Sequence, residues 1–325
     1  MSAYIVHKAV EIDKIKKKLR PTEEQLRTEY IAQPKYDGCN MVAIKRGHWV
    51  PTVNKGLHAI KVGDVQMQPV DRGVVDLFSR TGEQVVSAHH IENALASAPF
   101  FPVGVYFGEY WHPYIDQPTV SGMFRKKDGT QYTEPMFVVF DFVTLEEWEQ
   151  GFSDLVYQDR VSRLPDMGHA IPECGGPVFY AESQGFLIDQ EMGSMEAARM
   201  LCGGGAYDGL ILRKPSGKWV KGDRGTGGEV IKVKPTITLD LRVAGIEEAV
   251  GAKTGRPVYT IVVDLGPRPE GNRLQTVGSG VPHEKSALPN LGDIIEVEAM
   301  CFSKFGLLRE PRYKGIRYDK TEADR

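Results

Sequence analysis

The stretch KYDGCN, residues 35–40, places a lysine, an acid and a glycine side by side. Four later segments set a charged residue in or beside an apolar, strand-like run: FGEYW (107–111), FVVFDF (137–142), YDGLILRK (207–214) and EVIKVKP (229–235). Burying an unpaired charge is costly, so charges kept in such places indicate partners or ligands. This ordered set decides how the chain is interpreted.

The composition is that of an ordinary globular protein, with 41% hydrophobic and 26% charged residues in a chain of 325. This length suits two domains, and no apolar stretch approaches the roughly 20 residues that span a bilayer. The N-terminus lacks the apolar core of a secretory signal. Four scattered cysteines argue against a zinc site or a disulfide framework, so we expect a reducing, cytoplasmic location.

The net charge of −3 is only weak evidence against a nucleic-acid partner, because distribution matters more than the sum. Basic residues cluster within 14–20, 125–127, 213–224 and 309–320. Each cluster alone is most simply a solvated surface. Together they are compatible with a basic groove balanced by acidic surface elsewhere.

Short runs rich in β-branched and aromatic residues predict strands over 41–50, 103–111, 135–143 and 209–214. Helices are expected over 87–98, from Ser153 as N-cap through 164, and from Ser194 to the glycines at 203–205. The segment 51–78 is predicted to be an unusually long loop and a substrate contact. Strands that outnumber helices without βαβ alternation indicate an α+β fold with antiparallel sheets.

The chain changes character after Pro235, where about five short strands follow at turn-punctuated spacing. Such a segment suits a small closed barrel of the oligonucleotide-binding (OB) type. We therefore predict two domains, 1–235 and 236–325.

Lys35 is the candidate nucleophile. A free lysine amine has a pKa of about 10.4, so it must lose a proton before it can attack phosphorus. We expect nearby cations, Lys232 and Lys234 among them, to favour the neutral amine. Asp37 and Gly38 would complete a tight turn, with Gly38 allowing close approach to the ligand. Standing alone, the same string is more simply a charged β-turn.

The other charged positions each have a functional and a structural interpretation. Glu109 would accept hydrogen bonds from sugar hydroxyls, or form a structural ion pair. Phe140 would stack on a purine, or belong to the core. Asp208 would help to hold a divalent cation, or form an Asp-Gly turn. Lys232 and Lys234 lie two apart in a strand and so project from one face, where phosphates would suit them better than solvent.

In this order the segments resemble the motifs of the covalent nucleotidyltransferases, and most closely the small phage-type ATP-dependent DNA ligases. The family's lysine motif matches residues 35–38, its SRxG motif 79–82, its GE motif 108–109 and its aromatic motif Phe140. The metal-binding motif corresponds to Asp208, Gly209 and Arg213, the KxK motif to 232–234, and the C-terminal motif to 308–320. The resemblance covers about 31–320.

The resemblance implies the following roles. Lys35 would become adenylated by ATP, with Mg²⁺ or Mn²⁺ held by Asp208 and Glu109, and the adenylate would pass to a nick in double-stranded DNA. The site residues it implies are Glu109 for ribose, Phe140 for adenine, Lys232 and Lys234 for the α-phosphate, Arg80 for the nick phosphate, and Arg312, Arg317 and Asp319 for pyrophosphate. A monomer acting in DNA replication or repair is expected.

Three departures from the family pattern concern the metal geometry and the phosphate contacts and not the class of reaction. Asn40 stands where the family commonly has arginine, Asp208 replaces a glutamate, and Arg213 replaces a lysine. Three alternatives share parts of the pattern: an RNA ligase, a GTP-dependent capping-type enzyme, and a non-catalytic nucleic-acid-binding protein.

Overall fold

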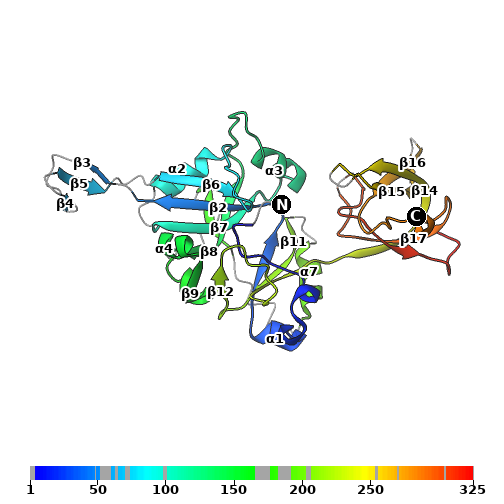
Figure 1. Ribbon diagram of the computed structural model, residues 1–325, viewed down its shortest axis with the longest axis horizontal. Coiled ribbons are helices and arrows are strands. Elements are labelled where there is room, and N and C mark those ends of the chain that lie inside the picture. The colour runs from blue at the N-terminus through cyan, green and yellow to red at the C-terminus, as the bar shows by residue number, and fades with distance from the viewer. Residues whose placement is uncertain are drawn as a thin grey trace. The chain divides into compact units, whose positions relative to one another are not determined.

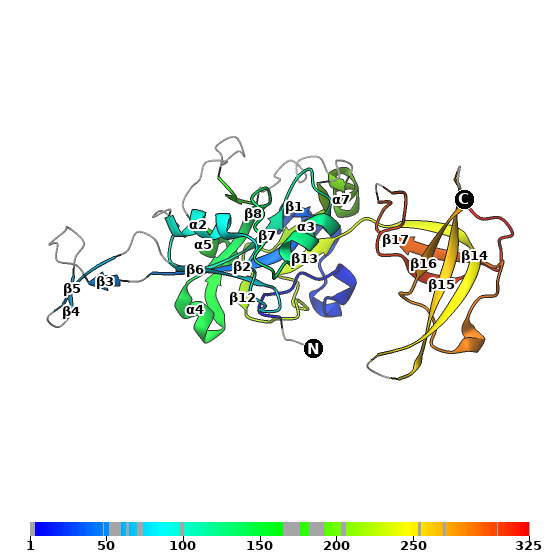
Figure 2. The ribbon, with the colours of Figure 1, turned by 90° about the horizontal axis from the view of Figure 1, so that it is seen from above.

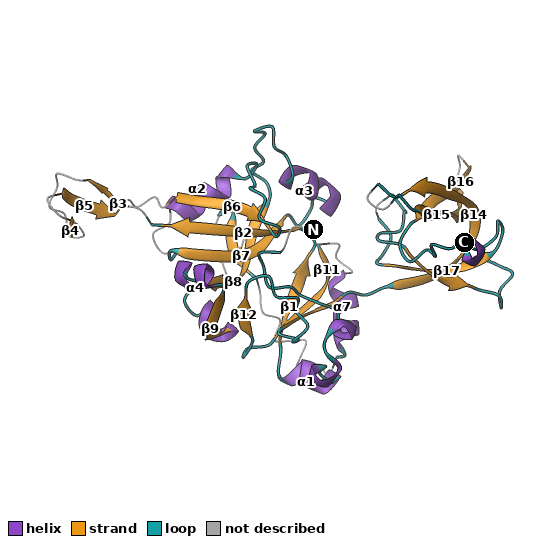
Figure 3. Ribbon diagram, viewed as in Figure 1, coloured by secondary structure: helices purple, strands orange, loops and turns teal. Residues whose placement is uncertain are grey.

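The computed structural model describes residues 4–47, 49–51, 60–62, 65–69, 74–97, 101–164, 176–181, 192–202, 206–252, 255–268, 271–303 and 305–324. The chain forms two compact units, Met1–Val233 and Lys234–Arg325. Strands outnumber helices in both, and most strand pairs are antiparallel, which confirms the predicted class of mixed structure with antiparallel sheets (Figure 3). No helix among these residues is long and apolar enough to cross a membrane.

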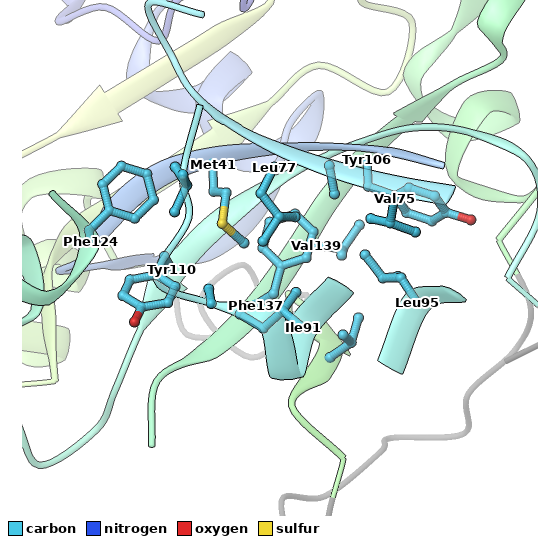
Figure 4. Packing of buried hydrophobic residues seen from close by; sticks show 14 of the residues in the cluster. Met41, Val75, Leu77, Ile91, Leu95, Tyr106, Tyr110, Phe124, Phe137 and Val139 are labelled. Atoms are coloured by element: carbon cyan, nitrogen blue, oxygen red, sulfur yellow. The ribbon is translucent and has the colours of Figure 1, made fainter. Parts of the chain in front are cut away.

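The largest sheet of the first unit has the strand order β10-β8-β7-β2-β6 (Figure 1). Its strands are Val178–Tyr180, Met136–Val143, Gly104–Trp111, Cys39–Arg46 and Val74–Ser79, and only β10 and β8 are parallel. Helices α2 (His89–Ser97) and α3 (Gln117–Phe124) pack on one face. Side chains such as Met41, Leu77, Tyr106 and Phe137 fill the space between, as Figure 4 shows. The strands and the helix predicted over these segments are thus present.

A smaller sheet joins β1 (Ile31–Tyr36), β11 (Tyr207–Arg213) and β13 (Val230–Val233), all antiparallel. One face packs on helices α1 (Glu23–Thr28) and α7 (Ser194–Cys202) through Leu26, Ala198 and Ile231. A capping box between Thr22 and Gln25 begins α1. The helix predicted from Ser194 is confirmed, although its expected stop at 203–205 lies outside the described residues. The other face carries alternate residues of the same strands, including Lys35.

The helix predicted from Ser153 is wrong. Residues Phe152–Val156 form strand β9, which pairs with β12 (Lys218–Val220), and helix α5 starts only at Tyr157 and ends at Val161. Ser153 is buried and its hydroxyl donates to Glu147 in helix α4 (Leu145–Gln150). Tertiary pairing therefore overrides the local capping signal.

The prediction of one long loop over 51–78 is also wrong where the chain is described. Strands β3 (Trp49–Pro51), β5 (Val65–Pro69) and β4 (Ile60–Val62) form a small antiparallel sheet of their own (Figure 2), and β6 begins at Val74. Residues 52–59, 63–64 and 70–73 lie outside the described residues. The segment connects β2 to β6 as an inserted hairpin-like element.

The second unit is a five-stranded antiparallel sheet of order β16-β15-β14-β17-β18. The strands are Gly271–Val277, Pro257–Arg268, Ile237–Val250, Ile294–Ala299 and Arg312–Ile316. Its inner side chains include Leu241, Val263 and Val297. Within the described residues, no continuous ladder of paired strands closes this sheet into the predicted barrel. The edge strands meet through a single parallel bridge, Ser279 with Arg312.

Candidate functional site

Lys35 lies near the end of β1, where the pairing with β11 shifts register between Pro34 and Tyr36. Such bulges redirect side chains. The Lys35 amine donates a hydrogen bond to Asp208 Oδ1 at 2.7 Å, and the side chains are 21% and 4% exposed. The group that contacts this amine is therefore a carboxylate and not one of the expected cations. Attack requires that this ion pair open.

Gly38 is required by the fold. A Cβ built there would lie 2.2 Å from the backbone oxygen of Tyr110 on β7. At this glycine the structure shows a close approach between two segments of the chain. The short KYDG turn fixes where β1 ends against β7, and so where Lys35 sits.

Glu109 faces the same site from β7, where it pairs in register with Asn40 on β2. Burial raises the pKa of this carboxyl to about 8, the Lys35 ammonium opposes the rise, and the charges of Asp208 and Asp37 reinforce it. Glu109 is therefore largely protonated near neutral pH, in which form it donates as well as accepts a hydrogen bond.

This shift predicts a pH-dependent stability difference between the protein and its Glu109→Gln variant. Between about pH 4.5 and 8 the folded state binds more protons than the unfolded state. The contribution of Glu109 to the free energy of unfolding is therefore full below pH 4.5 and is lost as the pH rises through 8. Glutamine does not titrate. We expect the variant to gain about 2–4 kcal/mol relative to the protein between pH 5 and 9, measured by urea unfolding. Glu149→Gln, at an exposed position on α4, is the control, and equal slopes for both variants would contradict the prediction.

Phe140 is half-buried on β8, with the Arg213 guanidinium 4.3 Å from its ring centre. Arg213 also donates to the Gln33 side chain at 2.7 Å, and Gln33 in turn donates to the Tyr157 hydroxyl at 3.3 Å. Arg213 thus places a planar cation over the ring that we predict to bind adenine. One surface of Phe140 is already covered.

Phe140 and Arg213 line a pocket in the first unit. The pocket lies between the two sheets of the first unit, and other walls come from Phe107, Asn40 and Val230. Four polar atoms at its walls are buried without a hydrogen-bond partner: His7 Nε2, Asn40 Oδ1, Trp219 Nε1 and Glu229 Oε2. Such groups are rare in folded proteins and call for a partner such as water, an ion or a ligand. His7 was missed in the sequence because it belongs to no recognisable motif, and Glu229 was quoted only as the first residue of the segment 229–235, without a role.

The remaining predicted phosphate contacts are placed as follows. Lys232, on β13, lies 3.2 Å from a Glu11 carboxylate oxygen. Lys234 begins the second unit and lies 3.9 Å from Glu310. Arg80 is exposed after β6, with its guanidinium 5.2 Å from the ring centre of Tyr4. Of these predicted cations, the structure places only Lys232 on the sheet that carries Lys35.

The predicted pyrophosphate contacts of the second unit form an internal network. Arg317 donates to both carboxylate oxygens of buried Asp240, at 2.9 and 3.0 Å, and to Asp319 at 2.9 and 2.8 Å. Hydrogen bonds from Arg317 hold the pKa of Asp319 at about 2. Lys320 also donates to Asp240. Arg312 instead is exposed at the start of β18.

The donor chemistry at Lys35 fits Mg²⁺. The charge of Asp208 contributes to the raised pKa of Glu109, and a bound cation would favour the ionised form of Glu109. Mg²⁺ commonly takes one or two carboxylates together with water and substrate phosphates. In the described part of the chain, no three His, Cys, Asp or Glu side chains form a group that could hold a metal. The residues thus suit an ion that arrives with a nucleotide.

Comparisons with known proteins extend these observations. No protein-family model and no curated protein matches the chain. Among solved structures, one described as Pmar-Lig_PreS3 is similar over 97% of this chain and 68% of that one, with 22% identity and a TM-score of 0.64. A structure from work on DNA binding with a minimal scaffold by Lig E DNA ligases is similar over 96% and 98%, with 15% identity and a TM-score of 0.61. The resemblance stated from the motifs is confirmed at the level of the fold, and the chain has the fold of the DNA ligases.

Proposed function

We propose that this protein is an ATP-dependent ligase that seals nicks between 5′-phosphate and 3′-hydroxyl ends in duplex DNA through a lysine–AMP intermediate. The observation that carries the proposal is the Lys35 amine, paired at 2.7 Å with buried Asp208 beside Glu109, on a ligase fold. The unit 1–233 would be the adenylation domain, and the second unit would be the OB-type domain. The Lig E comparison supports DNA as the partner.

The chemistry would proceed in three displacements. Lys35 Nζ, once its ion pair opens and its proton leaves, attacks the α-phosphorus of ATP; an N–P bond forms and the bond to pyrophosphate breaks. A 5′-phosphate oxygen of the nick then attacks the same phosphorus, and the N–P bond breaks. Finally the 3′-oxygen attacks the 5′-phosphorus, and AMP leaves. Positioning supplies most of the acceleration.

This chain's residues would divide the work as follows. Glu109 would bind ribose, Phe140 would stack on adenine, Lys232 and Lys234 would hold the α-phosphate, and Arg80 would contact the nick phosphate. Asp208 Oδ1 accepts a hydrogen bond from the reacting amine and would hold its proton as the ion pair opens. Mg²⁺, when bound by Asp208 and Glu109, neutralises phosphate charge; Mn²⁺ would suit the same oxygen ligands. Arg312, Arg317 and Asp319 would meet the departing pyrophosphate.

The test is to mix the purified protein with magnesium and α-labelled ATP. We expect label that survives a denaturing gel, is discharged by nicked DNA, and yields a sealed strand. Labelled GTP in place of ATP tests a capping-type enzyme, and a nicked RNA duplex tests an RNA ligase. A protein that binds nicked DNA yet never becomes labelled would be a non-catalytic binding protein. Sedimentation of the protein with and without DNA tests the proposed monomer.

A further inference from the structure

The first residues that the structure describes are held by two separate loops of the first unit. The backbone N–H of Ile5 donates to the backbone oxygen of Arg80 at 2.9 Å. The backbone N–H of Lys8 donates to the backbone oxygen of Asp223 at 3.1 Å. The segment 4–8 is therefore anchored at both ends, and one anchor is the loop that carries the proposed contact of the nick phosphate.

The ring of Tyr4 brings two cations together. The Lys8 ammonium nitrogen lies 4.4 Å from the ring centre, and the central carbon of the Arg80 guanidinium lies 5.2 Å from it. Both distances are within the roughly 6 Å of a cation–π contact. Tyr4 is itself half-buried and packs against an apolar cluster that contains Val6 and Trp219. The ring is thus a fixed platform for charges that come from two separate segments.

These two cations have no acidic partner. Several other exposed cations of the first unit are paired: Lys14 with Asp13, Arg46 with Asp76 and Lys126 with Asp128. In the part of the chain that the structure describes, neither Lys8 nor Arg80 forms an ion pair with a carboxylate. Because both contact one ring, their separation does not exceed roughly the 10 Å over which charges interact in 0.1 M salt. Like charges held so close favour an anion beside them.

The spacing of the two cations suits a nucleic-acid backbone. Phosphates of one strand follow each other at about 3.4 Å along the duplex axis, so two cations less than about 10 Å apart can contact neighbouring phosphates. Such contacts position a protein on DNA. We propose that Tyr4 is a positioning residue that holds Lys8 beside Arg80, and that Lys8 binds a second phosphate of the strand that Arg80 contacts. This inference rests on the proposed function, because both cations would bind the DNA that is to be sealed.

The test is the binding of a nicked duplex with a 5′-phosphate, followed by fluorescence anisotropy without magnesium between about 50 and 200 mM salt. Lys8→Ala should reduce the slope of log Kd against log salt by about one, as expected for the loss of one phosphate contact. Tyr4→Leu should raise Kd about 5–30-fold at an unchanged slope, because both cations remain but must be ordered when DNA binds. Tyr4→Phe keeps the ring and should restore the affinity.

The matched control is Arg46→Ala. Arg46 is an exposed cation at the end of β2, and it is paired with Asp76. Its removal changes the net charge by the same amount as Lys8→Ala, and the salt slope should stay unchanged. An unchanged slope in Lys8→Ala, or an equal Kd for Tyr4→Leu and Tyr4→Phe, would overturn the inference.

A second measurement separates DNA from the nucleotide, whose triphosphate also has neighbouring phosphates. A raised KM for ATP in self-adenylation of Lys8→Ala, with the binding of nicked DNA unaffected, would assign the pair of cations to the triphosphate and overturn the inference as well. If the protein forms no adduct with ATP and seals no nick, the proposed function fails instead. The anisotropy measurements then still decide whether Tyr4 and Lys8 hold DNA.

Discussion

Lys35→Ala will form no covalent adduct with ATP, and its rate of self-adenylation will fall by at least about 10⁴-fold, as expected when a nucleophile is removed. The measurement is mass spectrometry of the intact protein after exposure to ATP and magnesium. The same variant should still seal a nick whose 5′-phosphate already carries AMP, because the nitrogen–phosphorus bond has by then been made and broken.

The control for this experiment is Lys126→Ala, which removes an exposed lysine that contacts only Asp128 among the ion pairs of the described residues. It should be adenylated normally. Loss of Lys35 leaves Asp208 buried without its ammonium partner, so Lys35→Ala/Asp208→Asn is the variant to use if the single substitution unfolds. An adduct of undiminished yield on another side chain of Lys35→Ala would refute the assignment.

Arg160→Met will destabilise the first unit by about 3–5 kcal/mol, the cost of breaking a buried ion pair by removing one partner. Arg160 is 3% exposed and donates to both oxygens of Asp141, at 3.0 and 2.8 Å. It also donates to the backbone oxygens of Leu155 and Gly217, at 2.9 and 3.0 Å. The change would leave Asp141 charged in the interior, directly after Phe140. Urea unfolding followed by tryptophan fluorescence gives the loss.

Arg163→Met is the matched control, because its pair with Glu147 at 2.7 Å is partly exposed. Exposed pairs contribute about 1 kcal/mol or less. The double variant Arg160→Met/Asp141→Leu removes both buried charges and should recover much of the loss. Equal effects of Arg160→Met and Arg163→Met would show that burial of the first pair does not determine its contribution.

The strands of the first unit could be predicted because their sequence carries local signals. Residues 104–111 and 136–143 are apolar, aromatic and bounded by turn formers, and both are strands as expected. Glu109 could be predicted as a site residue because a charge inside such an apolar run is unexpected. Ser153 shows the limit of such signals: a good capping residue lies in a strand because β12, more than 60 residues later in the chain, pairs with it.

The site could be predicted only where its residues lie in motifs. Lys35 and Asp208 were each singled out from their own segment, but nothing local indicates that they form an ion pair, since the strand register of β1 against β11 decides it. His7 and Glu229 are separated by most of the first unit, and each taken alone is an ordinary polar residue. Their meeting depends on how the N-terminal segment crosses the sheet edge near β13.

The network around Asp240 has a consequence for any anion that Arg317 is to bind. The guanidinium already has two carboxylates as partners, so a phosphate group must compete with them for its N–H donors. The net free energy of binding is then the difference between the phosphate contact and the carboxylate contacts that it replaces. A contact of this kind is readily reversible, and its strength depends on the carboxylates of the same unit. If Arg317 meets pyrophosphate as proposed, Asp240 would set how firmly the pyrophosphate is held and how quickly it is released.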